Sequence, residues 1–282
     1  MTSIDSSKSR SISRSSRAGR TTATLGFSSH SVLGALGLPI TFLALLTLGW
    51  EVMARRLANP LVPDVAEVAT ELVAIVASGI FFSHMAITLG RVALGFLVAF
   101  VVSLILGICM GRNQYARQFF EPAILIGLTV PGLVWALLCV IWFGISLTTS
   151  TLAVALSLSP PLTLSIAQGI KTVNADLQEI TAVYRLSIWS RLRFLFLPTL
   201  TPFLLNGIRI GLSMGWKVIV LVEIFGLSSG VGYRLNTEYS AMNVAGVLAW
   251  TIGFAGVMAL LEYGVIGGIE RYVTRWRRVA TV

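Results

Sequence analysis

Long apolar stretches alternate with short polar or basic segments along most of the chain. Each stretch reaches about 20 residues, the length that an α-helix needs to cross the hydrocarbon core of a bilayer. The expected spans are residues 32–53, 85–111, 121–143, 146–168, 203–225 and 244–269. The pattern therefore predicts an all-α, polytopic membrane protein with six transmembrane helices, whose membrane domain occupies residues 32–278.

Prolines and one polar loop modify this pattern. Pro131-Gly132 interrupts the third span, and proline in a membrane helix is tolerated where neighbouring groups satisfy the freed carbonyl. The break either bends the helix around a pathway or serves packing alone. Between the first two spans, Asp64 is expected to start a helix within residues 59–85. That helix lies along the membrane surface or packs against the bundle.

Basic residues cluster at the ends of the apolar stretches. With residues 1–31 as a disordered basic arm, fifteen Lys and Arg residues lie on one side of the predicted membrane and four on the other. The positive-inside rule then places both termini and the loop of residues 169–202 in the cytoplasm. The net charge of +9 is therefore explained by topology, and no basic face with interleaved aromatics indicates a nucleic-acid partner.

Composition supports the membrane assignment and excludes several kinds of chemistry. The chain is 55% hydrophobic and only 12% charged, far from a soluble globular mixture. It has no phosphate-binding loop, no zinc-protease motif and no nucleophile elbow, so we expect neither an enzyme nor a cofactor or metal site. Cys109 and Cys139 lie within apolar stretches and are expected to be buried packing residues.

A polar, helix-prone segment at Asp176–Pro202 separates the fourth and fifth spans. We expect two short helices in it. Asp176 stands near the start of the first, which has apolar side chains at helical spacing: Leu177, Ile180, Val183 and Tyr184. Ser187 is expected to cap the second, over residues 188–197. Pro198 and Pro202 should then limit that helix and open the next one.

This segment resembles the EAA loop of ABC-transporter permeases, specifically those of the nitrate, sulfonate and taurine import family. Glu179 matches the glutamate that opens the loop, Ser187 and Trp189 match a following Ser-x-Trp, and Leu197-Pro198 matches its end. Two positions depart from the pattern. Ile180-Thr181 replaces the alanine pair, and Arg185 stands where the family has glycine. Because arginine adopts a left-handed turn less easily than glycine, we expect a turn of different shape or one shifted to Leu186-Ser187.

Four further phrases resemble the same family, and together they extend the likeness over residues 60–275. They are Thr-Leu-Gly-Arg-Val-Ala-Leu-Gly-Phe at 88–96, Ile-Trp-Phe-Gly-Ile at 141–145, the segment 207–223, and Ser-Ser-Gly-Val-Gly-Tyr at 228–233. The resemblance implies a type I importer permease fold in the bacterial inner membrane. It also implies a homodimer, ABC ATPase subunits that bind the ATP, and a periplasmic or lipoprotein substrate-binding protein.

By this resemblance the loop docks in a groove of the ATPase. Glu179 would pair with a basic partner residue while Ile180 and Tyr184 fill the groove, and the remaining loop residues complete the coupling set: Thr181, Arg185, Ser187, Trp189 and Pro198. Nitrate, taurine, alkanesulfonates and a heterocyclic vitamin precursor all remain candidate substrates, because selection in such importers rests largely on the binding protein.

Inside the spans, ionisable residues are candidates for the pathway. Lys217 either attracts an anionic substrate or pairs with a group of its own bundle, and Glu223 belongs to a gate or to a docking surface for the binding protein. Glycines recur every four residues in the fifth span, at Gly207, Gly211 and Gly215, which allows close helix approach within the bundle or at the subunit interface.

Two other classes of protein fit a polytopic helical chain. An ion-coupled secondary transporter should show buried acids near the middle of the membrane and inverted repeats. Only Glu223 and Glu262 match that loosely, and no repeat is evident. A non-transporting membrane scaffold would bring no ATPase with it on purification, which separates it from a permease.

Overall fold

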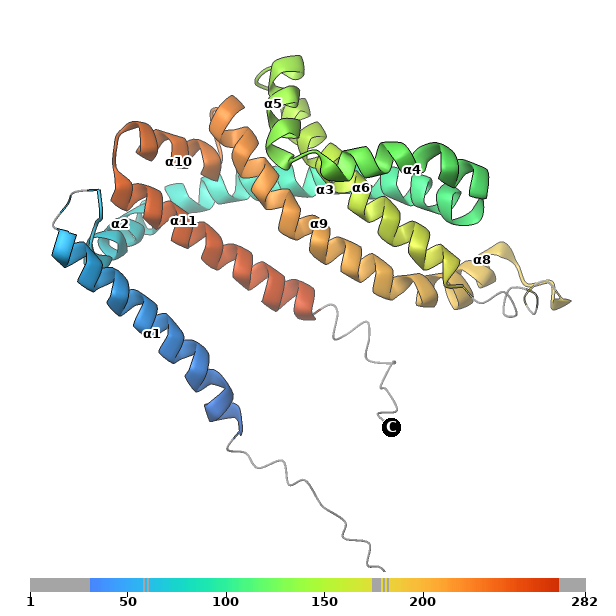
Figure 1. The fold of residues 1–282 in the computed structure, drawn as a ribbon, viewed down its shortest axis with the longest axis horizontal. Helices are drawn as coiled ribbons and strands as arrows, with labels where there is room; N and C mark the ends of the chain where they lie inside the picture. The colour runs from blue at the N-terminus through green and yellow to red at the C-terminus, as the bar shows by residue number, and fades with distance from the viewer. Residues whose placement is uncertain are drawn as a thin grey trace, which may run out of the picture. The chain divides into compact units, whose positions relative to one another are not determined.

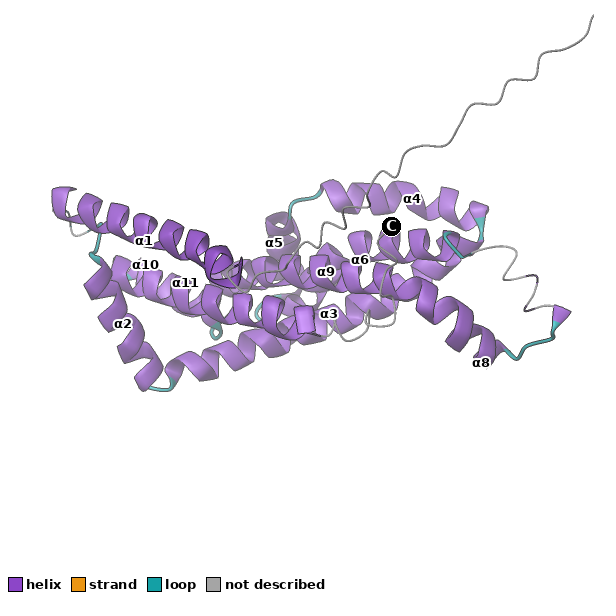
Figure 2. Cartoon of the chain, turned by 90° about the horizontal axis from the view of Figure 1, so that it is seen from below, coloured by secondary structure: helices purple, strands orange, loops and turns teal. Residues whose placement is uncertain are grey.

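A computed structural model describes residues 31–57, 59, 61–173, 179, 181 and 183–268. All the regular structure among them is helical, as predicted (Figures 1 and 2). The helices are α1 Ser31–Leu57, α2 Val65–Ala77, α3 Ile80–Arg112, α4 Gln114–Thr129, α5 Gly132–Phe143, α6 Leu147–Lys171, α8 Ile188–Arg191, α9 Leu197–Gly226, α10 Val231–Ser240 and α11 Val244–Ala259, with π-helical segments at Leu192–Phe196 and Leu260–Ile266. Contacts divide the chain into Met1–Gly49 and Trp50–Val282. The first unit holds the start of α1, and the large apolar side chains between Leu38 and Leu48 are exposed, as in a lipid-facing helix.

Six spans result if each bent pair of helices counts as one crossing. Four helical stretches are long and apolar enough to cross by themselves: Gly37–Leu57, Ile80–Arg112, Leu147–Lys171 and Val244–Gly264. The two bent pairs are Gln114–Thr129 with Gly132–Phe143, at 97°, and Trp189–Gly226 with Val231–Ser240, at 50°. The protein is therefore all-α and polytopic.

The third predicted span consists of two helices, α4 and α5, which meet at a sharp break and not at the mild kink that a proline often makes. Pro131 has no N–H to donate, and Val130 before it is extended, with φ −72° and ψ 119°, as residues before proline prefer. Gly132 starts α5 against α9, where a Cβ would lie 2.7 Å from Cγ2 of Val218. The sequence predicted the place of the break but not its angle.

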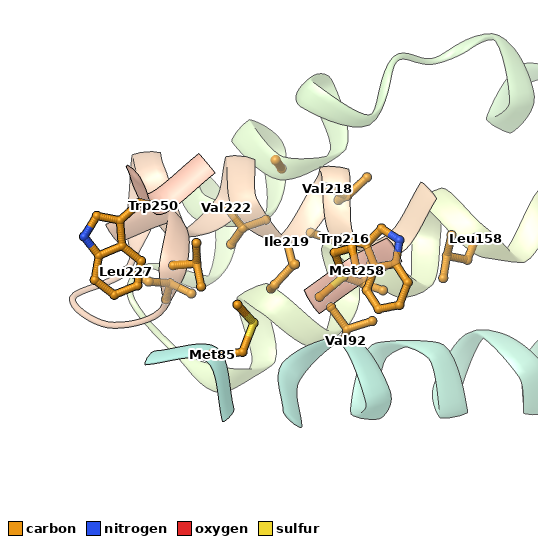
Figure 3. Close-up of a cluster of buried hydrophobic side chains, with 14 of the residues drawn as sticks. Met85, Val92, Leu158, Trp216, Val218, Ile219, Val222, Leu227, Trp250 and Met258 are labelled. Atoms are coloured by element: carbon orange, nitrogen blue, oxygen red, sulfur yellow. The ribbon is translucent and has the colours of Figure 1, made fainter. Parts of the chain in front are cut away.

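The core of the second unit lies between α3, α6, α9 and α11. Its side chains are mostly large and apolar, with Met85, Val92, Leu158, Ile219 and Trp250 among the buried ones (Figure 3). Small residues let α3 and α6 approach closely: a Cβ on Gly107 of α3 would lie 2.7 Å from Cβ of Ile166 on α6. Cys139 is buried as expected, whereas Cys109 is exposed and does not pack in this core.

The glycine stripe of α9 faces neighbouring helices of the same chain. Gly207 and Gly211 both face Leu162 of α6, and Gly211 also faces Phe96 of α3. Gly215 faces Leu158 and Val92 on the same two helices.

The helix predicted after Asp64 begins at Val65. The carboxylate of Asp64 accepts a hydrogen bond from the backbone N–H of Glu67 at 2.7 Å. Val68 and Ile75 on its inner face are buried in the core. Packing against the bundle therefore describes α2 better than a position along the membrane surface.

The prolines after the polar segment do not separate two helices, contrary to our prediction. Trp189–Gly226 is one helical run, and the π-helical segment Leu192–Phe196 lies just before Pro198. A π turn shifts the hydrogen-bond pattern by one residue, so it accommodates a position that cannot donate and whose ring crowds the preceding turn. Ser187 caps the start of this run as expected, since its hydroxyl accepts from the N–H of Ser190 at 3.2 Å.

Candidate functional site

In the loop between α6 and α8, a helical turn ends at Arg185. Arg185 has φ +49°, in the left-handed region, and the N–H of the next residue, Leu186, donates to the carbonyl of Thr181 at 3.0 Å. This is the hydrogen bond of a Schellman motif, whose left-handed position is usually glycine. The turn is therefore at the position where the resemblance places glycine, and arginine adopts the glycine-like conformation there.

A second hydrogen bond holds the loop to the following helix. Nη2 of Arg191 in α8 donates to the same carbonyl of Thr181, at 3.2 Å, and Thr181 is buried. Thr181 and Arg191 thus hold the loop, while other predicted coupling residues point outward.

The outward side chains form an exposed apolar surface, which we call the coupling knob: Val183, Tyr184, Leu186 and Trp189. Tyr184 is 75% exposed and Trp189 is 72% exposed. Glu179 is exposed beside them in sequence, whereas Asp176, Leu177 and Ile180 lie outside the described residues. Large exposed aromatics next to a fixed turn are typical of a surface that a partner covers.

A buried polar network lies at the other end of α9. Glu223 is fully buried, and its carboxylate accepts from Nη1 of Arg91 at 2.8 Å and from the hydroxyl of Thr88 at 2.9 Å. Helical spacing places Thr88 and Arg91 on one face of α3 with His84, toward the turn between α9 and α10. The backbone N–H of Gly230 in that turn donates to Nδ1 of His84 at 3.0 Å.

The same network closes the first turn of α10. The N–H of Gly232 donates to Glu223 and the N–H of Val231 donates to Thr88, both at 2.9 Å. A helix leaves its first N–H groups without partners and its N-terminus favours negative charge, so a carboxylate from α9 meets both needs. Arg91 also donates to the carbonyl of Ser229 at 2.7 Å, which fixes the preceding turn.

Glycine is required at this contact. Gly230 has φ +105°, and a Cβ there would collide with the carboxylate of Glu223. Three of the phrases that carried the resemblance, at 88–96, 207–223 and 228–233, thus meet in one network. Sequence reasoning missed this, although opposite charges at Arg91 and Glu223 within apolar spans were the available signal.

Glu223 is consequently not a docking surface for a binding protein, because its side chain is buried and bonded inside the chain. Lys217, two turns earlier on α9, has a different environment. Its side chain is exposed and lines a cavity of about 350 Å³ together with Pro131 and Gly132 at the break between α4 and α5, and with Ser157 of α6. Of the two candidate pathway residues, only Lys217 faces an open space.

Known proteins resemble this chain in sequence and in fold. Residues 99–275 match the family described as binding-protein-dependent transport system inner membrane component. The taurine transport system permease protein of Escherichia coli strain K12 is 32% identical over 248 residues, which cover 84% of this chain and 88% of the relative. The formylaminopyrimidine transport permease protein of Halalkalibacterium halodurans is 26% identical and covers 85% of this chain and 96% of the relative. A chain of an inward-facing methionine ABC transporter structure superposes with a TM-score of 0.58 at 17% identity, covering 67% of this chain and 93% of that one.

Proposed function

Because the chain belongs to the family of binding-protein-dependent transport system inner membrane components, we propose how its parts divide the work of an ATP-driven importer. The chain is the permease subunit, and it is not the ATPase. A substrate-binding protein delivers the solute and ABC ATPase subunits bind ATP. Two copies of this permease line one pathway.

The observation that carries the coupling assignment is the fixed and exposed knob. The Arg185 turn and the Thr181 carbonyl hold the backbone, while Tyr184 and Trp189 remain available to a partner. We assign the knob, with Glu179, to a groove of the ATPase, where closure of the ATPases on ATP would move it. The knob and both termini then lie in the cytoplasm.

Substitution in the knob tests this assignment. Tyr184→Ala should weaken co-purification of the ATPase and reduce ATP hydrolysis stimulated by the binding protein by at least about tenfold, because buried aromatic anchors are worth about 2 kcal/mol or more. Glu179→Lys should also separate hydrolysis from transport in proteoliposomes. Tyr239→Ala is the matched control, since Tyr239 on α10 is equally exposed, at 70%. Wild-type ATPase binding and transport in both knob variants would refute the assignment.

We also propose that Lys217 attracts an anionic substrate to the pathway. A cation beside a broken helix and a hydroxyl, in a cavity of ligand size, suits a sulfonate or a similar anion. The similarity to a taurine permease supports that substrate class.

A further inference from the structure

A second open pocket lies at the end of the bundle where α3 and α6 finish and α4 begins. Arg112 is the last residue of α3, Lys171 is the last residue of α6, and Arg117 lies one turn into α4. These side chains line a pocket of about 490 Å³, which we call the basic pocket. A neighbouring hollow of about 350 Å³ shares Arg112 and Lys171 with it and is bordered by Phe196.

The pocket carries an excess of positive charge. Its lining has three cations and one carboxylate, and that carboxylate, Glu121, forms two hydrogen bonds with Arg117 at 2.9 and 3.1 Å. The guanidinium of Arg112 lies over the ring of Phe196, 5.4 Å from its centroid, which orients the cation without neutralising it. Gln114 and Gln118 add amide donors to the lining.

We propose that the basic pocket binds a phosphate group, and that an anionic phospholipid headgroup supplies it. Arg112 and Lys171 terminate two apolar membrane helices, so they stand at the depth where headgroup phosphates lie. Tyr115 and Phe119 are 82% and 75% exposed on the adjoining face of α4, as is typical of interfacial aromatics beside lipid. Free inorganic phosphate has the same recognition chemistry, and the experiment below separates the two sources.

The test uses the full-length permease, purified in neutral detergent and depleted of lipid. Thermal unfolding and native mass spectrometry are followed during titration with phosphatidylglycerol, with phosphatidylcholine, or with inorganic phosphate. The phosphatidylglycerol concentration for half-maximal stabilisation should rise by at least about tenfold in the double variant Arg112→Gln/Lys171→Gln, since two cations that attract the anionic headgroup are removed. Phosphatidylcholine should give no comparable shift.

Two further variants keep the result interpretable. Arg112→Lys/Lys171→Arg preserves both charges and should retain phosphatidylglycerol binding, which separates lost charge from lost folding. Arg193→Gln removes an exposed cation that is not part of the pocket lining and should leave binding unchanged.

The outcomes separate the alternatives. Equal stabilisation by inorganic phosphate, lost in the double Gln variant, would keep the phosphate site and overturn the lipid as its source. Equal phosphatidylglycerol binding by wild type and the double Gln variant overturns the site. Loss of ATPase association in that variant, with phosphatidylglycerol binding intact, would assign the pocket to the partner protein instead. Because lipid binding is measured on the permease alone, failure here leaves the coupling knob untouched.

Discussion

Glu223 shows how a single buried charge can organise two helices and the turn between them. Its carboxylate meets Arg91 and Thr88 from α3 and the N–H of Gly232 from α10. A buried ion pair is weak evidence for net stability, but removing one partner leaves the other charge uncompensated in an apolar setting. The position therefore tolerates change poorly even though it touches no substrate.

We predict that Glu223→Gln destabilises the purified permease by about 3 kcal/mol, because Arg91 loses its counter-charge while remaining partly buried. Thermal unfolding in detergent measures this. Glu121→Gln is the control: its pair with Arg117 is one helical turn apart and partly exposed, so the expected cost is below about 1 kcal/mol. In a double-mutant cycle, Arg91→Leu with Glu223→Leu should cost less than the two single changes added together. Additive costs would contradict a direct coupling.

Arg185 gives a prediction of the opposite sign. Arg185→Gly should stabilise the loop by about 1 kcal/mol, because glycine adopts φ +49° without the steric cost that a side chain incurs. The expected observation is slower hydrogen exchange at the N–H of Leu186, which donates to Thr181 across this turn. Arg185→Ala removes the charge but keeps the strain, so it should not slow exchange. Faster exchange in the glycine variant would refute the left-handed assignment.

Among the elements, α3 and α6 depend most on the absence of side chains. Gly95 of α3 faces Val154 of α6, and Gly107 faces Ile166, each at distances where a Cβ would collide. Lipid tails are as apolar as leucine, so moving an apolar side chain from lipid into a helix interface brings no hydrophobic gain. Close van der Waals packing must therefore hold membrane helices together. We therefore expect the fit between these two helices to contribute to the stability of the bundle.

The variant Gly107→Ala should destabilise the permease by about 1–3 kcal/mol, because its Cβ would lie 2.7 Å from Cβ of Ile166 and force the helices apart. Gly90→Ala on the same helix is the control. It meets nothing within 4 Å, so alanine's helix propensity should leave stability unchanged or raise it by up to about 1 kcal/mol. Adding Ile166→Ala to Gly107→Ala should restore part of the loss. The melting temperatures of the four proteins decide the matter.

At the element scale, apolar length made the four to six candidate membrane spans predictable, and the serine cap at Ser187 followed from local chemistry. The 97° angle between α4 and α5 was not predictable. Pro131 removes a hydrogen-bond donor, but the angle depends on how Gly132 packs against Val218, which is distant in the sequence. The continuity of the helix through Pro198 was also missed, since a π turn leaves no mark in hydrophobic spacing. The meeting of Thr88 with Glu223 depends on contacts between residues far apart in sequence, which no single segment reveals.

For the molecule as a whole, Lys217 is the residue whose change should alter transport without altering assembly. Lys217→Met should reduce uptake of a sulfonate such as taurine by at least about tenfold while ATPase binding stays normal. The reason is that the variant loses a hydrogen bond between the ammonium group and the anion, and a hydrogen bond to a charged group is worth about 1.5–3 kcal/mol. Uptake into proteoliposomes containing ATPase and binding protein measures it, and Lys217→Arg should retain most activity. Unchanged uptake by the methionine variant would remove the anion assignment.

The helical run from Trp189 to Gly226 has one further consequence. At 1.5 Å per residue it extends about 55 Å, with the coupling knob beside its first turn and Glu223 in its last. A π-helical segment lies near its start, and from Leu197 to Gly226 the run continues as one α-helix, which we expect to move as a unit. A displacement of the coupling knob would then tilt or rotate the opposite end of the helix, where Glu223 contacts Arg91 and the turn before α10.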